Sequence, residues 1–282
     1  MPERGSNFGQ TAGAGVPGLR AGAAPPGLRA GAAAPGGGSG STPLLAVAGV
    51  SKRFRGLLAV SDASIDVHPG EIVALIGPNG AGKTTLLNLI AGSLAPDTGS
   101  VRFGGREMAG ERADRVCAAG IGRTFQLVKP FADMSVLENA MVGGFRGTAD
   151  RERARERAAR ALQSLDMWAL RDRPASSLTL PDRKRLEVAR ALATEPTMLL
   201  LDEVMAGLRP TETDLMVAAF RKLNTEHGIT ILLIEHVMRA VMALAQRVYV
   251  LHHGQIIAQG TPQQVTRDPR VLESYLGTGA VQ

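Results

Sequence analysis

The sequence has only one cysteine, Cys117, and few aromatic residues among its 282 positions. A single cysteine excludes a disulfide framework and a metal cluster built from several thiolates, so a reducing compartment is favoured. No apolar run approaches the roughly 20 residues needed to cross a bilayer, and we interpret Met198–Leu201 as a buried strand. The net charge of +6 is spread thinly and aromatic residues make up only 4%, so nucleic-acid binding is not expected.

The first 43 residues differ in composition from the rest of the chain. They are rich in Gly, Ala and Pro, and GLRAGAA occurs twice, at Gly18–Ala24 and Gly27–Ala33. Such a segment cannot bury enough apolar surface to offset its ordering entropy, and it lacks the continuous apolar stretch of a secretory signal. We therefore expect a disordered extension at 1–43, one folded domain at 44–278 and a short tail at 279–282.

A glycine-rich loop follows the most apolar early strand. Glu71–Ile76 is a β-branched, apolar run typical of a buried central strand, and Gly77–Thr84 fits the pattern G-x-x-x-x-G-K-[ST]. Glycines let the backbone curl with its N–H groups inward, which with the next helix N-terminus forms a site for nucleotide phosphates. In this P-loop, Lys83 is expected to reach the β- and γ-phosphates and Thr84 to hold Mg²⁺. The predicted phosphate-binding residues are Gly77, Pro78, Asn79, Gly80, Ala81, Gly82, Lys83, Thr84 and Thr85.

Polar residues come directly after two further predicted strands. Met198–Glu203 reads MLLLDE, a buried parallel strand that ends in two carboxylates. Asp202 is expected to bind Mg²⁺ directly or through water, and Glu203 to lie where an attacking water sits. Gln126 follows the predicted strand Ile121–Phe125, at the end that faces the ligand crevice in an open α/β sheet.

Two residues have both a structural and a functional interpretation. His236 follows the apolar strand Ile229–Glu235 and lies at the same predicted crevice, although a lone histidine is more often structural than catalytic. Phe54 lies on a predicted strand, where a single aromatic side chain is as readily part of the core as part of a binding site. Spacing alone leaves both alternatives open.

The other elements are predicted from periodicity and turn residues. Short β-rich pieces before the P-loop predict an antiparallel sheet, and the pattern from Met134 to about Leu170 is helical. The other predicted strands are Leu44–Phe54, Leu57–Val60, Ala63–Val67, Gly99–Phe103 and a hairpin of Val248–His252 with Gln255–Ala258; helices are expected at Glu111–Ala119 and up to Leu276.

The motifs together resemble one known family. GPNGAGKTT, TFQ, LEVARALA, LLLDE and LLIEH occur in the order and spacing of ABC-transporter ATPase subunits, and the resemblance covers about residues 44–278. GIGRTFQ, MSVLENAMVG, AGLRPTE and VLESYLG look like the ATPases of branched-chain amino acid importers. The resemblance implies an α/β fold: a P-loop NTPase (RecA-like) core, an antiparallel β flank and a helical lobe at about 127–181.

The same resemblance implies a role for each candidate residue. Phe54 would stack on adenine, Gln126 would sense Mg²⁺ and the attacking water, and His236 would contact the γ-phosphate. Glu203 would be the general base, with ATP and Mg²⁺ as the bound species.

By this resemblance the chain is an ATP-hydrolysing subunit that energises uptake of branched-chain or related amino acids. Its expected partners are transmembrane permease subunits, received around Gln126–Phe131 and the Met134–Val142 helix, a second ABC ATPase subunit, and indirectly a periplasmic or extracellular binding protein. It would be peripheral, on the cytoplasmic face of the inner (plasma) membrane. The alternatives are an ATPase for lipopolysaccharide export and a soluble ABC ATPase in translation or DNA repair.

The chain departs from the family at its signature motif. The family reads LSGGQ, whereas the aligned residues here are Leu178–Asp182. Thr179 keeps a hydroxyl, but Leu180 and Pro181 replace the two glycines, and a proline has no N–H to donate. Asp182 adds a negative charge where a phosphate should bind. A second ATPase subunit with an intact signature would compensate, so a heterodimer is favoured.

A less specific interpretation carries equal weight. Thr179, Pro181 and Asp182 also make a good start for the predicted helix Arg183–Thr194, so the motif is equally consistent with tolerated drift. Arg209, where the family commonly has Asp, is a second departure.

Overall fold

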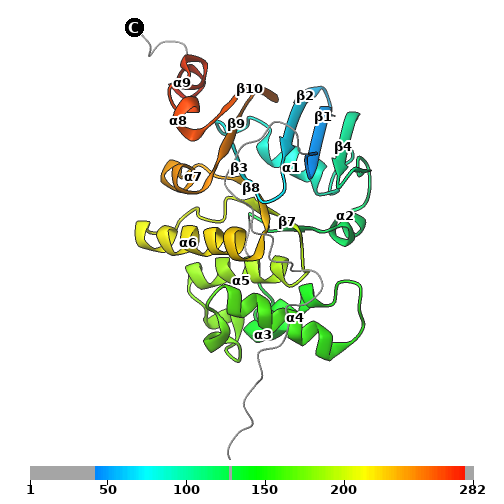
Figure 1. Ribbon diagram of the computed structural model, residues 1–282, viewed down its shortest axis with the longest axis vertical. Coiled ribbons are helices and arrows are strands. Elements are labelled where there is room, and N and C mark those ends of the chain that lie inside the picture. Colours follow the sequence, from blue (N-terminus) through cyan, green and yellow to red (C-terminus); the bar gives the residue numbers. More distant parts are fainter. Residues whose placement is uncertain (1–41, 127–128, 277–282) are drawn as a thin grey trace, which may run out of the picture.

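Two β-sheets form the framework of the computed structural model, which describes residues 42–126 and 129–276 (Figure 1). The predicted tail at 279–282 and all but the last two residues of the predicted extension at 1–43 lie outside the described residues. The antiparallel sheet orders its strands as β2 (Leu57–Val67), β1 (Leu45–Phe54), β4 (Thr98–Phe103) and β5 (Arg106–Glu107). The second sheet orders them as β10 (Gln255–Gly260), β9 (Arg247–His252), β3 (Ile72–Ile76), β8 (Thr230–Ile234), β7 (Met198–Asp202) and β6 (Ile121–Arg123).

The strand that precedes the P-loop, β3, lies in the middle of the second sheet. It pairs in parallel with β8 on one side and with β9 on the other, and all five of its residues are buried. β6, β7 and β8 also run parallel to one another. The carboxyl ends of these strands therefore meet at one edge of the sheet, which is where open α/β sheets bind their ligands.

Alternate residues of β3 face two separate cores. Ile72, Ala74 and Ile76 belong to a core shared with most of the helices, whereas Val73 and Leu75 belong to a core shared with the antiparallel sheet. This period of two is that of a strand buried on both faces. The helix after the P-loop, α1 (Lys83–Ile90), packs in the second core, between the two sheets.

A cluster centred on Arg247 connects the two sheets. From β9, its guanidinium donates to Glu71 Oε1 over 2.8 Å and to Asp66 Oδ2 over 2.9 Å, and Asp66 is the last residue but one of the antiparallel strand β2. Tyr249 also donates to Asp66 Oδ1 over 2.9 Å. Charge-assisted hydrogen bonds of this kind set the orientation of one sheet on the other.

Most of the helices form a layer over the opposite face of the second sheet. Figure 1 shows α3 and α4 at the end of the molecule opposite to α8 and α9, with the antiparallel sheet to one side. α3 packs against both α4 and α5. No helix among the described residues has the length and apolar character to span a bilayer. The helices after α1 are α2 (Ala113–Ala119), α3 (Val136–Gly144), α4 (Arg151–Ser164), α5 (Leu180–Leu192), α6 (Pro210–His227), α7 (Met238–Leu244), α8 (Pro262–Val265) and α9 (Pro269–Leu276).

Several predicted boundaries were wrong. The two strands predicted on either side of Ser61 and Asp62 form one strand, β2, whose pairing with β1 continues past these residues with a shift in register. Asp62 itself has φ +50, and its N–H donates to Ser51 Oγ of β1 over 2.9 Å, which keeps the two strands together at this point. The predicted strand Ile121–Phe125 ends at Arg123.

Helix boundaries also differ from the prediction. The helical stretch predicted from Met134 to Leu170 divides into α3 and α4, and Gly147 in the connection has φ +66. The helix predicted to begin at Arg183 begins at Leu180, because Thr179 is the N-cap and a proline is tolerated in the first turn. The lobe boundaries at about 127–181 and the domain boundaries stay predictions.

Candidate functional site

The P-loop requires glycine at two positions for steric reasons. Gly77 has φ +150, and a Cβ there would lie 2.0 Å from Leu251 O on the neighbouring strand β9. Gly82 has φ +105, and a Cβ there would lie 2.3 Å from Ala59 O on β2. Gly82 is also the N-cap of α1 and provides no side-chain cap, so the first N–H groups of the helix point towards the loop unsatisfied. Such a helix start binds anions.

Lys83 closes the loop from the inside. Its Nζ donates to Gly77 O over 2.8 Å and to Pro78 O over 3.0 Å, and the residue is only 7% exposed. Burial lowers the pKa of the ammonium, while the nearby carboxylates of Glu203 and Asp202 oppose that shift. The predicted lysine and the two predicted carboxylates therefore share one site.

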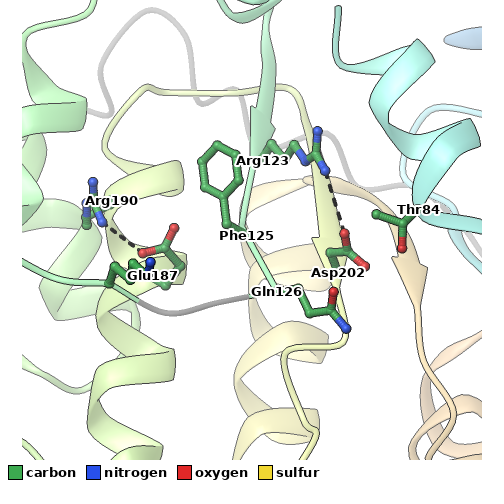
Figure 2. Close-up of a pocket in the computed structure, with 8 residues that line it drawn as sticks. Thr84, Arg123, Phe125, Gln126, Glu187, Arg190 and Asp202 are labelled. Carbon is green, nitrogen blue, oxygen red and sulfur yellow. Dashed lines mark hydrogen bonds and ion pairs between the residues drawn. The ribbon is translucent and has the colours of Figure 1, made fainter. Parts of the chain in front are cut away.

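The Asp202 carboxylate lies at the buried end of β7, opposite Thr84 (Figure 2). It is 1% exposed; its Oδ2 lies 3.6 Å from Arg123 Nη2, and its Oδ1 has no hydrogen-bond partner among the described residues. Burial raises the pKa of Asp202, and Arg123 opposes the rise. Thr84, Gln126 and Asp202 line one cavity of about 430 Å³.

These side chains fit a magnesium ion. A hydroxyl, an amide and a carboxylate with an unpaired buried oxygen are hard oxygen donors, which Mg²⁺ prefers. The described residues contain no group of three or more His, Cys, Asp or Glu that could hold a metal alone. Magnesium bound at nucleotide sites normally keeps waters and phosphate oxygens as its other ligands, so one protein carboxylate is sufficient.

Glu203 occupies a left-handed backbone position at the end of β7. Its φ is +50, and its N–H donates to Ile234 O on β8 over 2.9 Å. Gln126 Nε2 donates to Glu203 Oε2 over 2.8 Å, which brings two predicted residues together across the site. The partly exposed Glu203 carboxylate can accept a proton from a water beside it.

The two remaining candidates lie at the edge of the site. His236 is exposed and follows β8 by two residues, next to the buried Glu235. Phe54 ends β1 and is 41% exposed, with Lys52 Nζ 5.9 Å from its ring centre. The β1–β2 hairpin reaches the P-loop at Ala59, so Phe54 is available to a base, and its stacking role stays a prediction.

Known proteins share this arrangement. Residues 60–206 match the family model described as ABC transporter. The chain is 41% identical over 252 residues to the high-affinity branched-chain amino acid transport ATP-binding protein LivG of Escherichia coli strain K12, covering 84% of this chain and 99% of that protein. This chain belongs to the ABC transporter family.

Two further relatives and a solved structure agree. BraF of Pseudomonas aeruginosa, also named as a high-affinity branched-chain amino acid transport ATP-binding protein, is 39% identical over 84% of this chain and 99% of its own. The lipopolysaccharide export system ATP-binding protein LptB of Acidithiobacillus ferridurans is 34% identical over 83% and 97%. A nucleotide-free ATP-binding cassette from an ABC transporter is 33% identical with a TM-score of 0.77, covering 84% of this chain and 100% of its own.

These findings confirm the predicted family, the P-loop NTPase fold class and ATP hydrolysis as the activity of the cassette. A nucleotide is its ligand, and transmembrane subunits are its partners, as for ATP-binding subunits of ABC transporters generally. A second family model, described as branched-chain amino acid ATP-binding cassette transporter, matches residues 255–281.

The structure adds three charged residues to the site of this cassette that sequence analysis did not single out. Arg123 faces Asp202, and the buried Lys184 and Glu235 lie beside the Glu203 turn. Glu235 carried a signal, because it ends an apolar strand as Asp202 does. Arg123 and Lys184 had no such signal in the sequence, because no local pattern predicts that either residue lies in the site.

The polar side chains of the signature segment, Leu178–Asp182, form hydrogen bonds within the segment and with the helical turn that follows it. Thr179 Oγ1 donates to Asp182 Oδ2 over 2.7 Å, and Asp182 Oδ1 accepts from Arg185 Nη2. Leu180 is exposed, beside Gly207. The single hydroxyl of the motif is thus held within the first turn of α5.

A second cavity, of about 230 Å³, lies between β6, α3 and α5. Phe125 and Val142 are exposed at its lining, and Glu187 with Arg190 forms an ion pair of 2.9 Å there. Burial raises the pKa of Glu187, and Arg190 opposes the rise. Of the predicted permease groove at Gln126–Phe131, positions 127 and 128 lie outside the described residues.

Proposed function

We propose that this cassette powers an importer for branched-chain or related amino acids. The observation that carries the proposal is the match of residues 255–281 to the family model for branched-chain amino acid cassettes, a segment outside the general ABC transporter match. The identity of 41% to LivG, against 34% to LptB, supports import over lipopolysaccharide export. A soluble role in translation or DNA repair has no observation in its favour.

In this function the residues act on ATP in distinct ways. The P-loop amides and Lys83 bind the phosphates, and Phe54 stacks on the adenine. Glu203 accepts a proton from the attacking water, while Gln126 and His236 orient that water and the γ-phosphate.

A metal ion completes the proposed site. Thr84, Gln126 and Asp202 would hold Mg²⁺, which supplies compensation of the phosphate charge. Asp202 keeps one unpaired oxygen for this purpose, and Arg123 holds the other side of the carboxylate.

The cassette lies peripherally at the cytoplasmic face of the membrane. Its permease subunits dock at the cavity lined by the exposed apolar side chains of Phe125 and Val142, a cavity that also contains the ion pair of the buried Glu187 with the partly exposed Arg190. A periplasmic or extracellular binding protein delivers the amino acid to those subunits.

The second ATPase subunit is a different chain. Thr179 donates its hydroxyl hydrogen to Asp182, the other oxygen of Asp182 pairs with Arg185, and Pro181 has no N–H to donate. A segment with these properties binds a partner's γ-phosphate poorly. A partner with an intact signature completes the site at Lys83, so hydrolysis is concentrated there.

Purification of the full chain with its membrane subunits tests the proposed function. In nanodiscs, with the cognate binding protein, leucine, isoleucine or valine should stimulate ATP hydrolysis, and glutamate should not. Co-purification of lipopolysaccharide-export subunits, or ATPase activity indifferent to all three amino acids, would show that the proposal is wrong. The composition of the purified complex also reports whether the second ATPase is a distinct chain.

A further inference from the structure

The turn that carries Glu203 has an unfavourable backbone conformation. Glu203 adopts φ +50, a left-handed value that few residues other than glycine adopt. Such a conformation persists only where surrounding groups hold it, and it is concentrated at functional sites. The residues that follow, Val204 and Met205, are buried, so packing in the core restrains the C-terminal side of the turn.

Three hydrogen bonds from neighbouring elements hold this turn. The Glu203 N–H donates to Ile234 O over 2.9 Å, and the Met205 N–H donates to Glu235 Oε1 over 2.9 Å. From α5, Lys184 Nζ donates to the Glu203 carbonyl oxygen over 3.3 Å. The two peptide groups that follow the Glu203 side chain are therefore each bound by an ionisable side chain.

Both of those side chains are almost completely buried. Lys184 is 5% exposed and Glu235 is 1% exposed. Burial lowers the pKa of Lys184 and raises the pKa of Glu235, and in each case the other side chain opposes the shift. Glu235 Oε2 has no hydrogen-bond partner among the described residues.

This burial is costly and needs a reason. Buried charges of opposite sign rarely stabilise a fold more than apolar side chains of the same volume would. Their recurrence here, on the two peptide groups after the proposed base, is not explained by core packing. The burial of these two charged side chains is explained if ATP hydrolysis requires the Glu203 turn to keep this conformation.

We propose that Lys184 is a positioning residue for ATP hydrolysis, acting through the main chain of Glu203, with Glu235 as a second hold on the same turn. This rests on the proposed role of Glu203 as general base. Lys184 orients the Glu203 peptide so that the carboxylate stays within reach of Gln126, which lines the cavity. Misplacement of a catalytic group by about 1 Å costs on the order of 100-fold in rate.

The test uses the full chain in its purified transporter complex, four variants, and Glu203→Gln as a reference for loss of the proposed base. Lys184→Met removes the hydrogen-bond donor but leaves the Glu235 carboxylate buried without the Lys184 cation. The folding stability of this variant should therefore fall. Lys184→Met/Glu235→Gln removes both charges; Gln keeps an oxygen for the Met205 N–H, so folding stability should recover. Lys184→Arg keeps a cationic donor, and Lys222→Met makes the same substitution on α6 as a matched control.

The double variant separates positioning from charge balance. We expect its melting temperature to approach that of the wild type while kcat stays about 10- to 100-fold lower, with fluorescent ATP analogue binding unchanged. Lys184→Arg should restore much of the kcat, and Lys222→Met should behave as wild type. Recovery of wild-type kcat in the double variant, or parallel loss of kcat and nucleotide affinity, would overturn the positioning role.

The same experiment distinguishes failure of the underlying assignment. If Glu203→Gln hydrolyses ATP at the wild-type rate, Glu203 is not the base, and the proposed function of the site is wrong. If Glu203→Gln is inactive while the Lys184→Met/Glu235→Gln variant is fully active, only the positioning role is wrong.

Discussion

Gln126 Nε2 donates a hydrogen bond to Glu203 Oε2 over 2.8 Å, although the two residues are 77 positions apart in the chain. Gln126 follows β6 and Glu203 follows β7, and these strands are neighbours in the parallel sheet. The bond holds the carboxylate beside Gln126, which lines one cavity together with Thr84 and Asp202. Two residues that lie far apart in the sequence thus position one another in the site.

Glu203→Gln should slow ATP hydrolysis by about 100-fold or more, because the amide keeps the shape of the side chain but cannot accept a proton. ATP should still bind, so the closed two-cassette state should accumulate. Phosphate release and gel filtration with ATP measure these effects, with Glu226→Gln on α6 as a matched control. Hydrolysis at the wild-type rate, without ATP-dependent assembly, would contradict the role of Glu203.

Lys83→Ala should abolish hydrolysis and weaken nucleotide binding. The substitution removes the ammonium that bonds Gly77 O and Pro78 O and that is expected to contact the phosphates. Turnover in the assembled complex and binding of a fluorescent ATP analogue are the measurements. Lys222→Ala is the control, and normal turnover by Lys83→Ala would refute the site.

Hydrolysis should be concentrated at this chain's own P-loop if the second ATPase is distinct. Glu203→Gln alone should then reduce the activity of the complex more than substitution of the equivalent carboxylate in the partner. The proposed reason lies at Thr179 and Asp182, whose mutual hydrogen bond is expected to impair the partner's site rather than this one. A greater loss from the partner's substitution, or brisk ATPase from this chain as a homodimer, would exclude the asymmetry.

Glu107→Gln should destabilise the fold in a pH-dependent way. Burial acts against ionisation of Glu107, but hydrogen bonds from Ser100, the Ala109 N–H and the Val101 N–H outweigh it and lower the pKa from 4.5 to about 2. Because the native pKa lies below the unfolded value, the carboxylate stabilises the fold above about pH 4.5 and loses this effect towards pH 2.

Allowing for solvent screening of a half-exposed side chain, the cost should be about 1 kcal/mol of unfolding free energy at pH 7. Urea unfolding at pH 7, 4.5 and 3.5 measures it, with Glu111→Gln as the control. The difference between Glu107→Gln and wild type should shrink as the pH falls. A constant difference across that range would show that the hydrogen bonds do not depend on the charge.

The sequence predicted the elements of the site that are contiguous in the chain. The strand, glycine loop and helix from Glu71 to Ile90 follow one another in the chain, so a local sequence pattern is sufficient to predict a phosphate-binding loop there. Asp202 and Glu203 could be recognised for the same reason, as carboxylates ending an apolar strand. Predicted boundaries were wrong where a tertiary contact extended or ended an element, as at Asp62.

What the sequence alone determined was therefore the family, the P-loop and the fold class, and the roles of Asp202 and Glu203 stay predictions. Only the tertiary structure decided that Arg123 faces Asp202 and that Lys184 and Glu235 hold the Glu203 turn. These contacts depend on the lateral order of strands β6, β7 and β8 and on the packing of α5 beside them. Hydrophobic periodicity sets which face of an element is buried, but it does not specify which element lies beside it.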